Sequence, residues 1–418
     1  MEDAWIVVVG GPPAWGPCGS EALRMAEAFW KLGRKVLYIE CGGDNKPFRR
    51  AVGRREQRTQ AVVADLERRG FFVMRAAQMP LVSALLPEIA RRWDCSRTSA
   101  RAAKFLTASG ADSVVVFHYS WRWPDMLPAA LETVSHVYEC TDDHKNAPDS
   151  LCRPMMRRHI CSTEKKLLTS ADLVVFSSRE LEGVCEHSGR KVFLPMGVDA
   201  AHFARLAVRD PHGNAGLPER QPGRPRIGFV GRLTGRCDWA MVRAAAAETP
   251  DWQWIMAGPT EGIEPCGPDN LHWTGPIAYN ELPAWLHHWD VGLVPSTSST
   301  EFNRRSSPMK LLEYLAAGLP IASMDIPASR DLAGQAPGHV FIAEEYASAC
   351  LVDAVRRALA VPAWQREGGR AFARRHSWEE RAARLLDLTA PGRSTRRPDG
   401  QNAHLALKRS KASCRYTV

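Results

Sequence analysis

The chain of 418 residues is 45% hydrophobic and carries a formal net charge of +9. Its length allows two domains that each bury a core, and no apolar run reaches the roughly 18 residues that a membrane-spanning helix needs. The eleven cysteines are scattered and show no spacing typical of a zinc site, so we expect a reduced, cytoplasmic protein without a structural metal. The start of the chain, with the acidic Glu2 and Asp3, is unlike a signal peptide.

The positive charge indicates an anionic partner, which could be a phosphorylated donor, a lipid phosphate, a membrane surface or nucleic acid. Much of the excess lies in the cluster Arg49–Arg58 and in the stretch Arg393–Lys411. No zinc finger, helix-turn-helix or aromatic-rich RNA-binding motif surrounds either cluster. We therefore expect no nucleic-acid partner.

The first half of the chain alternates short apolar, β-branched segments with helical patterns. Strands are predicted at residues 5–10, 35–40, 113–117, 135–139 and 172–176. Buried strands that alternate with helices favour a parallel sheet covered on both faces. We assign residues 1–200 to an N-terminal Rossmann-like domain.

The same pattern restarts after residues 201–225, which are rich in Pro, Gly and charge and are predicted to be a linker or long surface loop. Strands are expected at 226–231, 252–257, 291–294 and 320–323. We assign 226–390 to a second Rossmann-like domain whose last helix could cross back to the first domain, and 391–418 to a basic disordered tail. Two facing parallel sheets would place a ligand in the cleft between them.

The segment that most strongly indicates a binding site runs from Ser306 to Pro320. Ser306 or Ser307 could cap a helix that carries Lys310 in its first turn, and a helix N-terminus with an added cation is suited to a diphosphate. Glu313 lies one turn further, where its carboxylate could accept two hydrogen bonds from a ribose diol. The alternative is an ordinary exposed helix with a Lys–Glu pair.

This segment resembles the donor-binding segment of the GT-B nucleotide-sugar glycosyltransferases of group 1, the family-4-like enzymes. Further segments are similar to that family in the right order, over about residues 5–390: 170–178, 194–199 with Phe203, 228–233, and 376–378. The opening residues 15–40 most resemble members of the teichuronic-acid-biosynthesis type.

The resemblance implies transfer of a sugar from a nucleotide diphosphate donor, UDP or GDP, with no further cofactor. The family's donor site corresponds here to Gly231, Arg232, Ser306, Ser307, Lys310 and Glu313. The first domain would bind the acceptor, a glycan or a lipid-linked molecule. The metal-binding Asp-x-Asp motif of the other large glycosyltransferase fold is missing, so no metal is expected.

One position departs from the family, because Arg305 stands where the first glutamate of its Glu-x7-Glu signature is expected. The donor sugar and the stereochemical outcome, retaining or inverting, therefore stay open. Arg304 and Arg305 could bind phosphate or an acidic sugar, or they could be solvated loop arginines.

The resemblance implies that the glycine-rich loop from Gly10 to Ser20 lines the acceptor side of the cleft, with Gly16, Gly19 and Ser20 as candidates. It is not a Gly-x-Gly-x-x-Gly motif. Glu40, at the end of the second strand, keeps an NAD-dependent oxidoreductase as an alternative, but the spacing of the glycines argues against it.

For acid–base chemistry the candidates are Asp142 and Asp143, directly after a predicted strand, and His118, at the end of another. An inverting enzyme needs such a group to deprotonate the attacking hydroxyl, whereas in a retaining enzyme the donor phosphate can take the proton. The alternatives are a turn or capping pair of aspartates and a hydrogen-bonded histidine at a strand end.

Residues 49–69 and 79–93 combine basic charge with an apolar face, which suits an anionic membrane surface at the inner face of the cell membrane. A solvated basic face over a core helix is the alternative.

Two other functions stay open: a sugar-nucleotide epimerase on the same fold, and a relative that binds nucleotide sugars without turnover.

Overall fold

The computed structural model describes most of the chain, with gaps between the described ranges: 3–10, 20–41, 69–77, 87–120, 131–147, 154–185, 187, 189–204 and 217–390. Gly16 and Gly19, the basic cluster Arg49–Arg58 and the predicted tail 391–418 lie outside these ranges. In the part that is described, no helix is long and apolar enough to cross a membrane.

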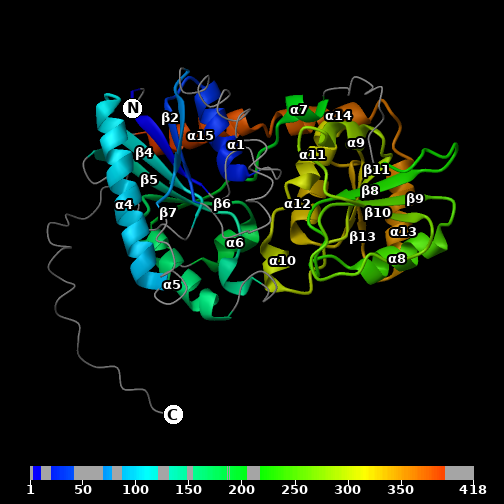
Figure 1. Cartoon of the computed structure of the whole chain (residues 1–418). Helices are drawn as coiled ribbons and strands as arrows, with labels where there is room; N and C mark the ends of the chain where they lie inside the picture. The colour runs from blue at the N-terminus through cyan, green and yellow to red at the C-terminus, as the bar shows by residue number, and fades with distance from the viewer. Residues whose placement is uncertain are drawn as a thin grey trace, which may run out of the picture.

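The first domain, at the left of Figure 1, is built on a seven-stranded parallel sheet in the order β3-β2-β1-β4-β5-β6-β7. The strands are β1 (Trp5–Val9), β2 (Val36–Glu40), β3 (Phe71–Arg75), β4 (Ser113–His118), β5 (Glu132–Cys140), β6 (Leu173–Phe176) and β7 (Arg190–Phe193). Every residue of β1, β2 and β6 is buried, which explains their unbroken apolar sequences. The five predicted strands are therefore confirmed, and β3 and β7 extend the sheet at its two edges.

Helices cover both faces of this sheet. They are α1 (Glu21–Lys31), α4 (Pro87–Ala108), α5 (Pro154–Ser170) and α6 (Arg179–Val184), with a short 3₁₀ helix η1 (His144–Asn146) after β5. The apolar side chains of α1 pack with alternate residues of β1 and β4 in one core cluster. The other side of β1 packs with residues of α4.

The second domain has a six-stranded parallel sheet in the order β10-β9-β8-β11-β12-β13. Its strands are β8 (Arg226–Val230), β9 (Gln253–Ala257), β10 (Leu271–Gly275), β11 (Val291–Val294), β12 (Ile321–Met324) and β13 (Val340–Ala343). Its helices are α8 (Trp239–Glu248), α9 (Leu282–His287), α10 (Glu301–Arg305), α11 (Lys310–Ala317), α12 (Pro327–Gln335), α13 (Ser348–Leu359) and α14 (Arg366–Arg374). The four predicted strands are present, and β10 and β13 are additional.

The last helix, α15 (Trp378–Thr389), returns to the first domain and lies beside α1 (Figure 1). Trp378 belongs to the first domain's core, and Arg381 donates two hydrogen bonds of 2.9 Å to the buried carboxylate of Glu139 on β5. The expectation that the last helix crosses back is confirmed, and the second domain of 226–390 is corrected to end before α15, which buries its apolar face in the first domain.

The predicted linker 201–225 is also corrected in part. The short helix α7 (Ala200–Ala204) follows the crossover between the domains, and residues 217–225 pack against the second sheet. Arg220 pairs with Asp290 at 3.1 Å, and the side chain of Gln253 donates to the carbonyl of Glu219 at 3.0 Å. These residues form an edge of the second domain, because their polar backbone groups find partners there.

Candidate active site

A polar cavity of about 240 Å³ lies between the two domains, where the carboxyl ends of their strands face each other. Its lining from the second domain includes three cations, and its lining from the first domain includes two carboxylates. The charged residues are Arg232, Arg236 and Lys310 on one side and Glu21 and Asp142 on the other. Opposite charges on two facing walls can hold an anionic group on one side and accept a proton on the other.

Lys310 is the first residue of α11, and its side chain extends over the turn after β8. A Cβ atom on Gly231 would lie 3.5 Å from the Lys310 Nζ atom, and the Nζ is 5.0 Å from the centre of the Phe229 ring. Burial, together with the charge of Arg236, lowers the pKa of Lys310. An anion in the cavity would therefore recover much of the ammonium's lost solvation.

Gly231 and Gly258 give this turn its shape. Both have positive φ angles, 149° and 146°, and a Cβ on Gly258 would collide with the carbonyl oxygen of Gly231. Only glycine is compatible with so close an approach of two loops. Gly231 therefore lies close to the Lys310 side chain, and its contact with a donor stays a prediction.

The prediction that Ser306 or Ser307 caps the helix is wrong. Met309 occupies the N-cap position of α11, and among the described residues no side chain caps it. Ser306 instead donates through Oγ to the carbonyl of Phe302 at 2.7 Å and accepts from the Arg236 guanidinium at 2.8 Å. Ser306 thus fixes a cation of the cavity, and it lines the cavity together with Ser307.

Arg232 lies at the mouth of the cavity, with 57% of its side chain exposed and a bidentate ion pair to Glu261. Arg236, which the sequence interpretation missed, lies deeper. Its Nε donates to Asn303 at 3.0 Å, and its guanidinium lies 4.6 Å from the Phe302 ring centre. Arg236 is therefore the better-fixed of the two arginines.

Glu313 lies one turn after Lys310, outside the residues that line the cavity. Burial raises the pKa of its carboxyl to about 7, against the opposing charges of Lys310 and Arg24. Arg24 belongs to α1 of the first domain and stacks on Tyr279 of the second at 4.1 Å from the ring centre. Contact between Glu313 and a ribose stays a prediction.

The acidic wall is formed by Asp142 and Glu21. Burial raises the pKa of Asp142 to about 6, opposed by Arg236, and burial together with the charge of Asp142 raises the pKa of Glu21. Thr141 donates to Glu21 at 3.4 Å. Glu21 follows the buried N-cap residue Ser20 of α1, and its place at a helix start after a glycine-rich loop is the signal that could have identified it.

The other two predicted catalytic residues lie elsewhere. Asp143 is 3% exposed at its side chain and pairs with Arg305. His118 is fully buried, and its Nδ1 is 2.8 Å from Nε2 of His136. The structure therefore brings only Asp142 of the three to the cavity. Within the described ranges, no three His, Cys, Asp or Glu side chains gather as they would around a metal ion.

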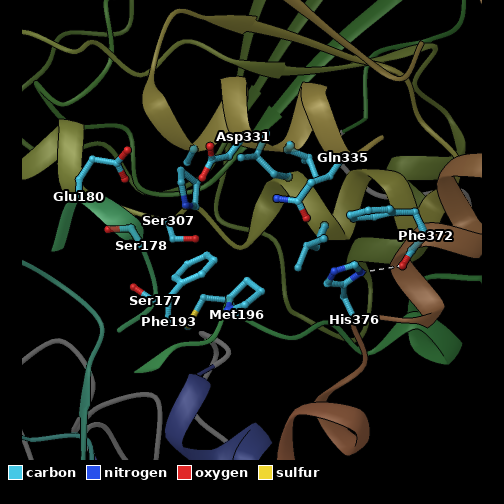
Figure 2. A pocket seen from close by; sticks show the side chains of 16 residues that line it. Ser177, Ser178, Glu180, Phe193, Met196, Ser307, Asp331, Gln335, Phe372 and His376 are labelled. Carbon is cyan, nitrogen blue, oxygen red and sulfur yellow. Dashed lines mark hydrogen bonds between the residues drawn. The ribbon is translucent and has the colours of Figure 1, made fainter. Parts of the chain in front are cut away.

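A second pocket, mostly apolar, adjoins the cavity and shares Met196, Ser307 and Pro308 with it. Figure 2 shows this second pocket from close by. Phe193 and Met196 line it from the first domain, and Phe372 and Leu332 from the second. The two spaces belong to one interdomain cleft that changes from polar to apolar along its length.

Comparison with known proteins finds similarity to one family over part of the chain. Residues 224–360 match the model of the group 1 glycosyl transferases. TuaH of Bacillus subtilis (strain 168), named as a glycosyltransferase of teichuronic acid biosynthesis, is 29% identical over 208 residues, which are 46% of this chain and 51% of TuaH. The chain thus spans about half the length of that relative.

Solved structures resemble nearly the whole chain. Sucrose-phosphate synthase from Thermosynechococcus elongatus has a TM-score of 0.62 at 17% identity, covering 92% of this chain and 98% of its own. Anabaena HepE in complex with UDP and glucose has a TM-score of 0.60 at 14% identity, with 93% and 100% covered.

The fold is therefore that of the GT-B glycosyltransferases, with two parallel α/β domains facing one cleft. Within that fold, residues 224–360 of the second domain are similar to the group 1 glycosyltransferases.

Proposed function

We propose that this protein transfers a sugar from a nucleoside diphosphate donor, with UDP or GDP as the leaving group, to a glycan or lipid-linked acceptor. One observation carries the proposal: a single cavity in a GT-B cleft sets Arg232, Arg236 and Lys310 of the second domain against Glu21 and Asp142 of the first. The HepE structure, which contains UDP and glucose, supports a nucleotide sugar as the class of ligand.

The cations of the second domain would hold the diphosphate and stabilise the negative charge that grows on it as the bond to the sugar breaks. Arg236 needs little reorganisation for this role, because Asn303 and Ser306 already fix its guanidinium. Asp142 faces the same cavity and would take the proton of the attacking hydroxyl in an inverting reaction. Holding both substrates in one cleft lowers the entropic part of the barrier.

The first prediction tests the donor class by thermal unfolding. At about 100 times its dissociation constant, a nucleotide stabilises its protein by roughly 2.7 kcal/mol, so UDP or GDP should raise the melting temperature of the full chain by several degrees. NAD should not, because the proposed site fits a diphosphate and one ribose. Stabilisation by NAD alone would overturn the proposal.

Turnover assays then separate the related functions. Release of UDP or GDP from a nucleotide sugar, or transfer to an acceptor, is the expected result. Sugar isomerisation without release of the nucleotide would identify an epimerase. Selective nucleotide binding without any turnover of a panel of donors would identify a binding protein.

We further propose that the protein works on the cytoplasmic side of an anionic membrane, where a lipid-linked acceptor would be found. The supporting feature is α4, which lies at the side of the first domain away from the second (Figure 1). Ile89 and Trp93, one turn apart, are 56% and 38% exposed. Exposed cations share the helix surface with them: Arg92, Arg97, Arg101 and Lys104. Apolar side chains among cations are typical of helices that bind at an anionic membrane surface.

The second prediction concerns this helix. The protein should sediment with vesicles that contain anionic lipid at low salt and dissociate as salt rises, since screening weakens surface electrostatics. The double variant Ile89→Ser, Trp93→Ala should bind these vesicles several-fold more weakly. Trp364→Ala is the matched control, because Trp364 is 79% exposed on the second domain. Equal binding by both variants, or binding that does not depend on salt, would contradict the membrane proposal.

A further inference from the structure

The short helix α10 of the second domain lies at the junction with the first domain, next to α6 and η1 (Figure 1). Phe302 of α10 packs with Ala147 and Ile160 of the first domain, and Arg305 makes two polar interactions with that domain. The guanidinium of Arg305 pairs with the carboxylate of Asp143, and its backbone carbonyl accepts a hydrogen bond of 2.7 Å from the Ser178 hydroxyl. Arg305 is therefore fixed to the first domain by both its side chain and its backbone.

The ion pair is shielded from water and well supported. Asp143 is 3% exposed and Arg305 15% exposed at their side chains. Asn146 donates a further hydrogen bond of 2.8 Å to Asp143, and Glu301 pairs with the other terminal nitrogen of Arg305 at 2.6 Å. A charge engaged by two carboxylates is poorly suited to binding phosphate or an acidic sugar, which were the roles considered for Arg305 from its sequence position.

Both residues of this ion pair are neighbours in the sequence of residues in the proposed active site. Asp143 follows Asp142, the proposed base, in the loop after β5. Arg305 precedes Ser306, Ser307 and Lys310, which line the cavity from the second domain. The ion pair therefore links the loop that carries the base to the segment that would hold the donor.

We propose that Arg305 is a positioning residue: through Asp143 it fixes the arrangement of the two domains in which Asp142 faces the donor's diphosphate. The inference rests on the proposed function for its effect on turnover, while the domain arrangement itself is independent of any substrate. Without the pair, the donor segment would keep its own contacts within the second domain, such as Arg236 with Ser306. Donor binding should therefore survive a change that impairs the alignment of the two walls.

The experiment compares Arg305→Ala, Arg305→Lys and Asp143→Asn in the full-length protein. Misalignment of about 1 Å can cost 10²-fold in rate, so kcat of Arg305→Ala should fall by about 10- to 100-fold while the dissociation constant of UDP or GDP changes less than about threefold. Arg305→Lys, which keeps the charge, should retain more turnover than Arg305→Ala. The double variant Arg305→Ala, Asp143→Asn should lose little more than the worse single variant, since both changes remove the same interaction.

Small-angle scattering gives a readout that needs no enzyme activity. Arg305→Ala and Asp143→Asn should show a larger radius of gyration than the parent in the absence of substrate. Arg330→Ala is the matched control, because Arg330 forms an exposed ion pair with Asp325 within the second domain, and it should resemble the parent in every measurement. Should Arg305→Ala fail to fold, Arg305→Lys and Asp143→Asn carry the comparison.

Folded variants with the parent's radius of gyration and kcat would overturn the inference. An equal loss of donor affinity and turnover in Arg305→Ala would also overturn it, since that result would show that the Arg305 side chain contacts the donor. A parent protein that binds no nucleoside diphosphate would refute the proposed function, and the scattering comparison would still decide whether the ion pair fixes the domains.

Discussion

Asp142→Asn should lower turnover by a factor of roughly 10²–10⁴, the usual contribution of a general base, while donor affinity stays close to that of the parent. Asparagine keeps the size of the side chain but cannot take a proton from the acceptor hydroxyl. Asp142 is the only predicted catalytic residue that the structure brings to the cavity, opposite Lys310 and Arg236. Steady-state kinetics beside calorimetric titration with UDP or GDP would measure both quantities.

The pH dependence of turnover gives an independent check on the same residue. Burial raises the pKa of Asp142 to about 6, and a base works only when it is deprotonated. Turnover of the parent should therefore rise with pH through about 6 and level off above it. The residual activity of Asp142→Asn should lack this rise.

Measurements of stability exclude misfolding as the cause of the lower turnover of Asp142→Asn. Because the pKa of Asp142 is raised from 3.8 to about 6 in the folded protein, folding disfavours its charged form, and its ionisation reduces stability as pH increases across that window. The melting temperature of Asp142→Asn relative to the parent should accordingly be higher at pH 8 than at pH 4. Parent-like turnover in a folded Asp142→Asn variant would show that the residue has only a role in the loop.

The central strands of both sheets could be predicted from sequence because burial on both faces makes them continuously apolar. The strands that were missed, β3, β7, β10 and β13, are the outermost in the sheet order. They are only partly buried: β7, for example, contains Arg190 and Lys191, and β10 contains His272 and Thr274. An edge strand with one solvated side resembles a loop when only apolar periodicity is considered.

Residues of the site could be predicted from the sequence where the start of a helix or the end of a strand determined their place in the fold. Lys310 begins a helix and Asp142 follows a strand, so each was expected at the cleft. Arg236 could not be found in this way, because its place depends on hydrogen bonds to Asn303 and Ser306, 67 and 70 residues further along the chain. Nor could sequence decide between Asp142 and Asp143, since the backbone of the loop determines which of two neighbours faces the cavity.

Lys310→Ala should reduce both donor affinity and turnover, with a loss of turnover of about 10²–10³-fold, the range measured when one group that stabilises a developing anion is removed. The negative charge on the leaving diphosphate grows toward the transition state, so the ammonium contributes more there than in the bound ground state. The two arginines that line the cavity with Lys310 already have partners: Arg232 is paired with Glu261, and Arg236 donates a hydrogen bond to Asn303.

Glu313→Ala should behave differently, although Glu313 lies only one turn from Lys310. A hydrogen bond to a charged acceptor contributes about 1.5–3 kcal/mol, so donor affinity should weaken roughly tenfold or more, with little change in kcat. A ribose contact is nearly the same in the ground and transition states and contributes uniform binding. Because burial raises the pKa of Glu313 to about 7, the loss of affinity should be larger at pH 8, where the carboxylate predominates, than at pH 6.

The two variants therefore test the donor site as a pair, with calorimetry and steady-state kinetics measured on each. Lys310 and Glu313 share one helix, so damage to α11 would affect both quantities in the same way for both variants. A separation, with kcat impaired in Lys310→Ala but retained in Glu313→Ala, can arise only if the two side chains meet different parts of the donor. If folded Glu313→Ala binds and turns over the donor like the parent at pH 8, the ribose lies elsewhere, and Lys310 alone would mark the donor site on α11.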